Sequence, residues 1–346
     1  MPLNRPSPGS VSPRRSIPIA WFVVALLIVG GVGITGTAAY YAYTGRGPTH
    51  GNLTLTDDLG RKVTMPYDPA RIVVLGPSIM DSVYRLGLRS HVVGVDCYAP
   101  EFGGLSSDYS PDQIALWNLS SSMCVQTGPT FNIEALLNDT PQLVLAATIV
   151  SISAAEELTN TFHIPVFMLQ PSTLGGVQVD VSLLGQIFGV ESAANSLDAQ
   201  IGTVLYHITN TVSAIAGGPN FTGFPTVLLT YYVDSNGYWT FGPGTFGESL
   251  IEVAGGSSIS ANATLPYPEL SGEQVLVANP HFLVYGTGFG LNESYYATAP
   301  FWGQLTSVQA GHTLGVDSNW VTEADPTMIL TGLPALFAFF YPLLPS

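Results

Sequence analysis

After about residue 70, the chain alternates between continuous apolar runs and segments in which apolar residues recur every three or four positions. The continuous runs predict buried strands at 71–75, 92–95, 143–147, 166–169, 227–231 and 313–316. The intervening segments predict helices at 78–86, 134–138, 245–254 and from about 326. Strands that are apolar on both faces and separated by helices form mostly parallel sheets covered on both sides. The pattern therefore predicts an α/β fold.

The longest helical pattern runs from Val190 to Ala216. Its apolar residues recur at helical spacing over 27 residues, which at a rise of ~1.5 Å gives a helix about 40 Å long. Apolar strands precede and follow it, so we predict two Rossmann-like lobes joined by a single long α-helix. Upstream, residues 56–65 are typical of a small hairpin that turns at Leu59 and Gly60.

One phrase occurs twice, 139 residues apart, beginning at Glu134 and at Glu273. In each copy the glutamate opens a short helix, a proline follows seven residues later, and an apolar strand run begins after one further residue. A polar residue precedes each copy as a helix cap, Asn132 and Ser271, and Gln274 completes a capping box with Ser271. The repetition supports two lobes of similar plan.

The N-terminal region has a different composition. Residues from Ile17 to about Tyr43 are almost wholly apolar, enough to cross a hydrocarbon core of ~30 Å, with three arginines before them and one after. The positive-inside bias predicts a single-pass anchor in the cell membrane, with a cytoplasmic N-terminus and extracellular lobes. A cleaved signal peptide, with Gly36 to Ala39 as cleavage context, is the alternative.

These patterns divide the chain into six parts. They are a cytoplasmic tail (1–15), a transmembrane anchor (16–44), a linker with the hairpin (45–69), an N-terminal lobe (70–175), an inter-lobe helix (176–217) and a C-terminal lobe (218–346). The apolar stretch from Met328 to Leu344 contains prolines and lacks flanking positive charge, which favours a packed terminal helix over a second membrane segment.

Charge is scarce and unevenly distributed. Only 10% of residues are charged, and acidic residues outnumber basic ones 24 to 9, so binding to nucleic acid is not expected. All the acidic residues follow residue 46. The scarcity of charge, rather than an excess of carboxylates, suggests an acidic habitat more than a saline one.

Two features fit an extracellular location. Cys97 and Cys124 are the only cysteines, and outside the cell a disulfide between them would persist; two unpaired buried thiols are the alternative. Six Asn-x-Ser/Thr sequons follow the predicted anchor and none precedes it, so we predict glycosylation at Asn52, Asn118, Asn138, Asn220, Asn262 and Asn292.

Several phrases, taken in order, resemble the substrate-binding proteins of ABC importers for cobalamin and ferric siderophores, the rigid class in which one long helix joins two α/β lobes. The resemblance covers the chain from about residue 56 to its end. The phrases are DDLGRKV (57–63) with PARIVV (69–74), GVDCY (94–98), NIEAL (132–136), ESLIEVAGG (248–256), PYPELSGEQVL (266–276) and DSNW (317–320).

The resemblance implies a set of roles. A glutamate on each lobe docks onto the permease, here Glu134 and Glu273, although both are also ordinary acids of a first helical turn. Aromatic side chains on loops at the strand ends contact the ligand, and the matching positions are Tyr98, Tyr231, Tyr267 and Trp320. Three further aromatic residues are neighbours without a matched position: Trp239, which we include among the predicted ligand contacts, Phe241 and Trp117.

Two departures from the family pattern bear on the ligand. Gly128 stands where an aromatic residue is expected, and the loop from Tyr98 to Thr130 is longer than usual and holds both cysteines. We expect a metal chelate, cobalamin or a related corrinoid first, and a ferric siderophore or heme as alternatives.

Enzymatic chemistry is not expected. The chain has no P-loop and no Gly-x-Ser-x-Gly elbow, its histidines form no short-range metal-ligand pattern, and no cofactor is predicted. We therefore expect a monomeric binding protein that serves an ABC permease dimer with its ATPase subunits. A sensor or adhesion ectodomain on the same fold is the alternative from another class.

Overall fold

The computed structural model describes residues 51–97, 109–127, 130–147, 150–219, 221–288, 291–318 and 324–342. The predicted anchor at 16–44 lies outside these ranges, as do Tyr98, Trp320 and the sequon at Asn220. Within the described ranges, no helix combines the length and apolar character that crossing a membrane requires.

The described part opens with the predicted hairpin. Strands β1 (Asn52–Thr56) and β2 (Lys62–Pro66) pair antiparallel, so the hairpin begins earlier than the sequence suggested. Asp57 shapes the turn, since its carboxylate accepts the backbone N–H groups of Leu59 and Arg61 and pairs with the Arg61 guanidinium at 2.6 Å. Gly60 supplies the positive φ of 74° that the turn requires.

The first sheet has four parallel strands in the order β4-β3-β7-β8. Its strands are β3 (Ile72–Leu75), β4 (Val92–Val95), β7 (Leu143–Ala146) and β8 (Val166–Met168). Both faces are buried, because alternate residues enter two different core clusters: Ile72 and Val74 enter one, and Val73 and Leu75 the other. The predicted reason for the continuous apolar runs, burial of both faces of a parallel sheet, is confirmed.

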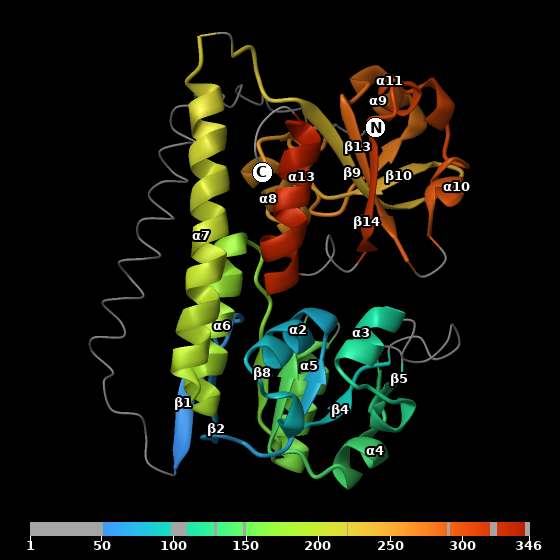
Figure 1. Cartoon of the computed structure of the whole chain (residues 1–346). Coiled ribbons are helices and arrows are strands. Elements are labelled where there is room, and N and C mark those ends of the chain that lie inside the picture. The colour runs from blue at the N-terminus through green and yellow to red at the C-terminus, as the bar shows by residue number, and fades with distance from the viewer. Residues whose placement is uncertain are drawn as a thin grey trace, which may run out of the picture. The chain divides into compact units, whose positions relative to one another are not determined.

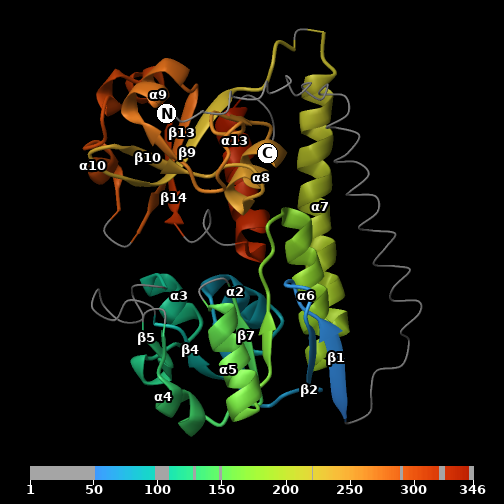
Figure 2. The ribbon, with the colours of Figure 1, turned by 180° about the vertical axis from the view of Figure 1, so that it is seen from behind.

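Short elements surround this sheet (Figures 1 and 2). The helices are α2 (Pro77–Arg85), α3 (Pro111–Leu116), α4 (Ile133–Asn138) and α5 (Ile152–Phe162), with 3-10 turns η1 (Arg89–His91) and η4 (Ser121–Met123). A two-residue ladder joins β5 (Gln126–Thr127) to β6 (Thr130–Phe131). Helix α5 was not predicted from the sequence.

Two packed helices follow in the chain, α6 (Leu174–Phe188) and α7 (Glu191–Ala216) (Figure 1). The helix predicted from Val190 to Ala216 is confirmed as α7, but the segment 176–217 also contains most of α6. The chain turns between them at Gly189, whose φ is 64°. The helices approach closely at Gly185, where an added Cβ would lie 2.6 Å from the Cβ of Ala194.

The second sheet is mixed rather than purely parallel. Its order is β12-β10-β9-β13-β14, with β11 also paired to β9. The strands are β9 (Thr226–Val233), β10 (Gly237–Thr240), β11 (Ser257–Ser258), β12 (Glu269–Ser271), β13 (Phe282–Thr287) and β14 (Thr313–Asp317). Strands β9, β11, β13 and β14 run parallel, as predicted, whereas β10 pairs antiparallel with both β9 and β12.

The helices of this half complete the core. They are α8 (Phe246–Val253), α9 (Gly272–Ala278), α10 (Glu293–Tyr296), η5 (Trp302–Gln304), α11 (Thr306–Gln309), η6 (Met328–Gly332) and α13 (Leu333–Phe340). Helix α13 buries Leu333, Leu336 and Phe337 and contacts α7 and α8, so the apolar C-terminal stretch packs into the fold over these residues.

Hydrogen bonds tie the segment that follows the second sheet to helix α2 beside the first sheet. Asp81 on α2 is buried, and its carboxylate accepts hydrogen bonds from the backbone N–H of Thr327 at 3.0 Å and from the Thr327 hydroxyl at 2.9 Å. Arg85 donates to the same carboxylate at 2.9 Å and to the Thr327 hydroxyl at 2.7 Å. A buried charge with this many partners is well satisfied.

Candidate ligand-binding and docking sites

Three aromatic rings meet on the second sheet; we call Tyr231, Phe241 and Tyr267 the aromatic cluster. The ring centroids of Tyr231 and Phe241 are 4.9 Å apart, and the Tyr267 ring lies 6.3 Å from Tyr231 and 6.1 Å from Phe241. Tyr231 is near the end of β9, Phe241 follows β10, and Tyr267 precedes β12. The spacings are those of favourable edge-to-face and tilted aromatic contacts.

The cluster is graded from buried to exposed. Phe241 is almost fully buried, Tyr231 is half-buried, and Tyr267 is 52% exposed. Backbone hydrogen bonds hold the segment that carries Tyr267 against β10, from Thr240 N–H to Pro268 O at 3.0 Å and from Gly242 N–H to Pro266 O at 2.8 Å. Tyr267 is therefore an accessible ring on a fixed backbone.

The cluster is apolar except for the hydroxyl groups of Tyr231 and Tyr267. Burial, and next the nearby Tyr267, raise the pKa of the Tyr231 phenol. The Tyr231 phenol therefore stays neutral at ordinary pH. The cluster presents ring faces and hydroxyl groups, the kinds of group that line binding sites for large, partly apolar ligands.

Trp239 lies apart from the cluster. On β10 its Cα pairs with Tyr232 and with Glu269, and its indole N–H faces the Asp234 carboxylate at 3.5 Å. The Tyr232 ring contacts Tyr295, 6.0 Å away, and among the described rings none of the cluster contacts Trp239. The predicted contact at Trp239 is thus separate from the predicted contacts at Tyr231 and Tyr267.

Trp117 was wrongly expected near the ligand. Its side chain is buried and packs against Tyr109, with ring centroids 5.9 Å apart, and against Tyr84 at 6.5 Å. The reason is its position at the end of α3, where Leu116 faces solvent and Trp117 turns into the core. Phe241 is buried as well, and serves as the base of the aromatic cluster.

The end of β4 is fastened to its surroundings. Asp96 follows the strand, is buried, accepts the Gly76 N–H at 3.1 Å and receives a hydrogen bond from the Tyr109 hydroxyl. Cys97 forms a disulfide with Cys124, with Cα atoms 5.5 Å apart. Cys97 is therefore fixed at the carboxyl end of a parallel strand, the edge at which open α/β sheets bind ligands. Sequence reasoning passed over Asp96, although a carboxylate directly after a buried strand was a visible signal.

The two predicted docking glutamates occupy equivalent positions. Each is the second residue of its helix and exposed, Glu134 on α4 and Glu273 on α9. The cap of α4 is Asn132, whose side chain accepts the Ala135 N–H at 3.0 Å. The cap of α9 is the predicted capping box, which the structure confirms. Each helix then leads through a buried proline, Pro141 or Pro280, into a strand of its sheet.

One of the sequons shares a helix with a docking glutamate. Asn138 is exposed and is the last residue of α4, four residues after Glu134. Residues four apart lie on one face of a helix. A glycan on Asn138 would cover the face that carries Glu134, so the two predictions exclude each other in any one molecule. The sequons at Asn52, Asn118, Asn262 and Asn292 are also exposed.

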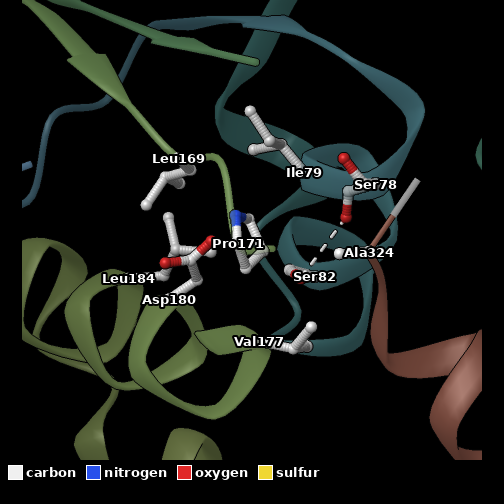
Figure 3. A pocket seen from close by; sticks show the side chains of 9 residues that line it. All are labelled: Ser78, Ile79, Ser82, Leu169, Pro171, Val177, Asp180, Leu184 and Ala324. Carbon is white, nitrogen blue, oxygen red and sulfur yellow. Dashed lines mark hydrogen bonds between the residues drawn. The ribbon is translucent and has the colours of Figure 1, made fainter. Parts of the chain in front are cut away.

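A small cavity lies away from these sites (Figure 3). It is lined by α2, α6, the segment after β8 and Ala324, and its volume of about 10 Å³ admits at most one water molecule. The wall includes Asp180, which is buried and shares a hydrogen bond with Asp58. Burial first, and then the neighbouring Asp58, raise the pKa of Asp180 well above its ordinary value. The cavity is too small for a chelate.

No set of three or more His, Cys, Asp or Glu side chains close enough to hold a metal ion occurs among the described residues. The aromatic cluster has a buried base in Phe241 and an exposed ring in Tyr267. Two α/β sheets with an accessible aromatic surface are features expected of a solute-binding protein.

Comparison with known proteins agrees with this class. The model of the periplasmic binding protein family matches residues 72–319, and the chain belongs to that family. A cobalamin-binding protein of Halobacterium salinarum is 28% identical over 284 residues, which cover 80% of this chain and 71% of the relative.

Solved structures share the fold at lower identity. A periplasmic heme-binding protein of Pseudomonas aeruginosa has a TM-score of 0.66 at 20% identity, covering 80% of this chain and 94% of its own. The periplasmic vitamin B12-binding protein of Vibrio cholerae has a TM-score of 0.61 at 19% identity, covering 80% of this chain and 98% of its own. The chain therefore has the fold of this family.

Proposed function

We propose that the protein is the membrane-anchored, extracellular solute-binding component of an ABC importer, and that it captures cobalamin or a related corrinoid. The aromatic cluster is the observation that carries the proposal. A corrinoid presents a wide, partly apolar surface, and the exposed Tyr267 ring backed by Tyr231 and the buried Phe241 is suited to it. Tyr98, Trp239 and Trp320 are further proposed contacts.

The relatives support this choice among chelates. The Halobacterium salinarum relative, at 28% identity, is named for cobalamin binding. Ferric siderophore or heme is the second candidate, because solved structures with the same fold include heme and ferric-hydroxamate proteins. A sensor or adhesion ectodomain is the alternative of another class, and the matched glutamates on α4 and α9 favour transport over it.

The proposal extends to architecture and partners. Two Rossmann-like lobes, one before and one after α7 in the chain, would hold the ligand between them. Glu134 and Glu273 would contact the two subunits of a permease dimer that carries its own ATPase subunits. The segment 16–44 would anchor the protein in the membrane with residues 1–15 in the cytoplasm. Intact mass of the protein from its native host, after extraction of membranes with alkaline carbonate, tests the anchor against a cleaved signal peptide.

Titration tests the ligand. The full-length protein in detergent is titrated with cyanocobalamin, a ferric hydroxamate and hemin, and binding is followed by quenching of tryptophan fluorescence and by visible absorption. We expect saturable binding of cyanocobalamin and a loss of affinity of about tenfold for Tyr267→Ala. An aromatic contact is worth up to about 1.5 kcal/mol, and a tenfold change in affinity corresponds to about 1.4 kcal/mol.

The matched control is Tyr206→Ala. Tyr206 is a more exposed tyrosine on α7, and its one described ring contact is with His207. Equal loss of affinity in both variants would assign the effect to general destabilisation. Tight binding of hemin with a Soret shift, and none of cyanocobalamin, would replace the corrinoid by the second candidate.

A further inference from the structure

An exposed apolar side chain accompanies each docking glutamate. On α4, Leu137 is 38% exposed and follows Glu134 by three residues; on α9, Val277 is 86% exposed and follows Glu273 by four. Residues three or four apart lie on the same face of a helix, one turn from each other. Each of these two short helices therefore presents a carboxylate and an aliphatic group side by side.

The core fixes both helices behind these side chains. Leu136 on α4 and Val275 on α9 are fully buried in their clusters. The caps at Asn132 and Ser271 fix the helix starts. The carboxylate and the aliphatic side chain of each helix are therefore held on a rigid support. An exposed side chain at these positions does not stabilise the fold by being apolar.

One exposed aliphatic residue is ordinary on a protein surface, but this arrangement is repeated. It occurs in both copies of the phrase, 139 residues apart, although the apolar residue sits at a different spacing in each. Both phrases have a leucine three residues after the glutamate, Leu137 and Leu276. Leu276 is partly buried, so on α9 the exposed aliphatic residue is Val277, one position later. Recurrence of the pair on separate helices is what equivalent halves of one partner would require.

Resting on the proposed function, we propose that Leu137 and Val277 are the apolar half of the docking contact, and that each permease subunit offers a basic group beside an aliphatic depression. Charge complementarity argues for the basic group, because the chain carries 24 acidic against 9 basic residues. The aliphatic depression follows from the neighbouring Leu137 and Val277, which lose water only against an apolar surface.

The two halves of the contact have different roles. The carboxylates provide attraction that salt weakens, whereas the aliphatic groups provide contact that salt leaves intact. In a chain with so little charge, the aliphatic half gives docking a component that does not depend on ionised glutamates. A partner must carry both a basic group and an aliphatic depression to dock in this way. At protein interfaces in general, charges at the rim supply specificity and buried apolar residues supply affinity.

Photo-cross-linking tests the inference without reference to any ligand. p-Benzoylphenylalanine replaces Leu137 or Val277 in the full-length protein in its native host, and cross-linked partners are identified by mass spectrometry. The controls carry the same residue at Ile152 on α5 or Val179 on α6, which are about half-exposed. We expect both test positions to cross-link to one polytopic membrane protein, with yields about tenfold or more above the controls.

Added salt and surface variants sharpen the result. The double variant Glu134→Gln/Glu273→Gln is expected to lower the cross-linking yield, and the yield that remains is expected to be unchanged by 0.5 M salt. Cross-linking to no polytopic protein, or equal yields at the control positions, overturns the inference. Failure of the titration with cyanocobalamin would overturn the choice of ligand and leave this result unaffected.

Discussion

Glu248 is a buried carboxyl whose effect on the free energy of unfolding can be measured as a function of pH. It is the third residue of α8, and it is 5% exposed. Its backbone N–H bonds to the Thr245 hydroxyl at 3.3 Å, while its Oε2 atom has no hydrogen-bond partner among the described residues. Burial raises the pKa of Glu248 to about 7. A hydrogen bond with Ser258 opposes this shift, and the charge of Glu252 one turn away adds a smaller upward effect.

The sign of the pH effect follows from this shift. The folded protein holds the Glu248 proton more tightly than the unfolded chain, so the contribution to stability is complete below the unfolded pKa of 4.5 and is lost as pH rises through about 7. Ionising a carboxyl whose pKa is about 7 instead of 4.5 costs the folded state roughly 3 kcal/mol, because each tenfold change in proton affinity is worth about 1.4 kcal/mol.

Glu248→Gln keeps the shape of the side chain and removes the ionisation. We expect the free energy of unfolding of the wild type to fall between pH 5 and 8.5, and the variant to lose about 3 kcal/mol less over that range. Denaturation in guanidinium chloride, followed by tryptophan fluorescence at several pH values, measures both curves. Glu157→Gln, at an exposed position on α5, is the matched control and should follow the wild type.

Two results would refute the reasoning. Wild-type stability that rises from pH 5 to 8.5 would show that the buried carboxyl is outweighed by groups of the opposite sign. A Glu248→Gln variant that is destabilised equally at every pH would show that the side chain acts through packing or hydrogen bonds and not through its charge.

Three further predictions follow from the described contacts. Removing the disulfide with Cys97→Ser and Cys124→Ser should lower the free energy of unfolding by roughly 3 to 4 kcal/mol, because the bridge closes a loop with a sequence separation of 27; denaturation with and without reductant checks this. Asp180→Asn should raise the unfolding temperature at pH 8 and change it little at pH 4, since the raised pKa of Asp180 makes its contribution one that is lost as pH rises; a thermal scan at both pH values that shows no difference would count against it. Glycopeptide mass spectrometry should find Asn138 unmodified, whatever the occupancy of Asn262, and a glycan there would contradict docking through α4.

Much of the architecture follows from local patterns. Continuous apolar runs identified β3, β7 and β8 because parallel strands bury both faces, and the spacing of apolar residues identified α7 over its whole length. The capping box of Ser271 and Gln274 was visible because it depends only on residues three apart. These features share one property: the interactions that determine them are close in sequence.

The parts that sequence missed depend on distant neighbours. Strands β10 and β12 are short and carry polar residues. Their pairing is set by a neighbouring strand, β9 for β10 and β10 for β12, rather than by their own pattern. Trp117 is typical of a binding residue in the sequence, but in the structure it packs against Tyr109 and Tyr84. The division between α6 and α7 had a signal in Gly189, whose left-handed conformation ends the first helix.

The position of Tyr267 has a consequence for how this family diversifies. Its segment lies beside β12, the outermost strand of the sheet, and hydrogen bonds to β10 through backbone atoms alone at Pro266 and Pro268. Its side chains can therefore be exchanged without disturbing the parallel strands that hold the protein together. If Tyr267 contacts the ligand as proposed, its exchange would alter recognition while the framework stays constant. The same fold occurs in solved proteins named for heme and for vitamin B12.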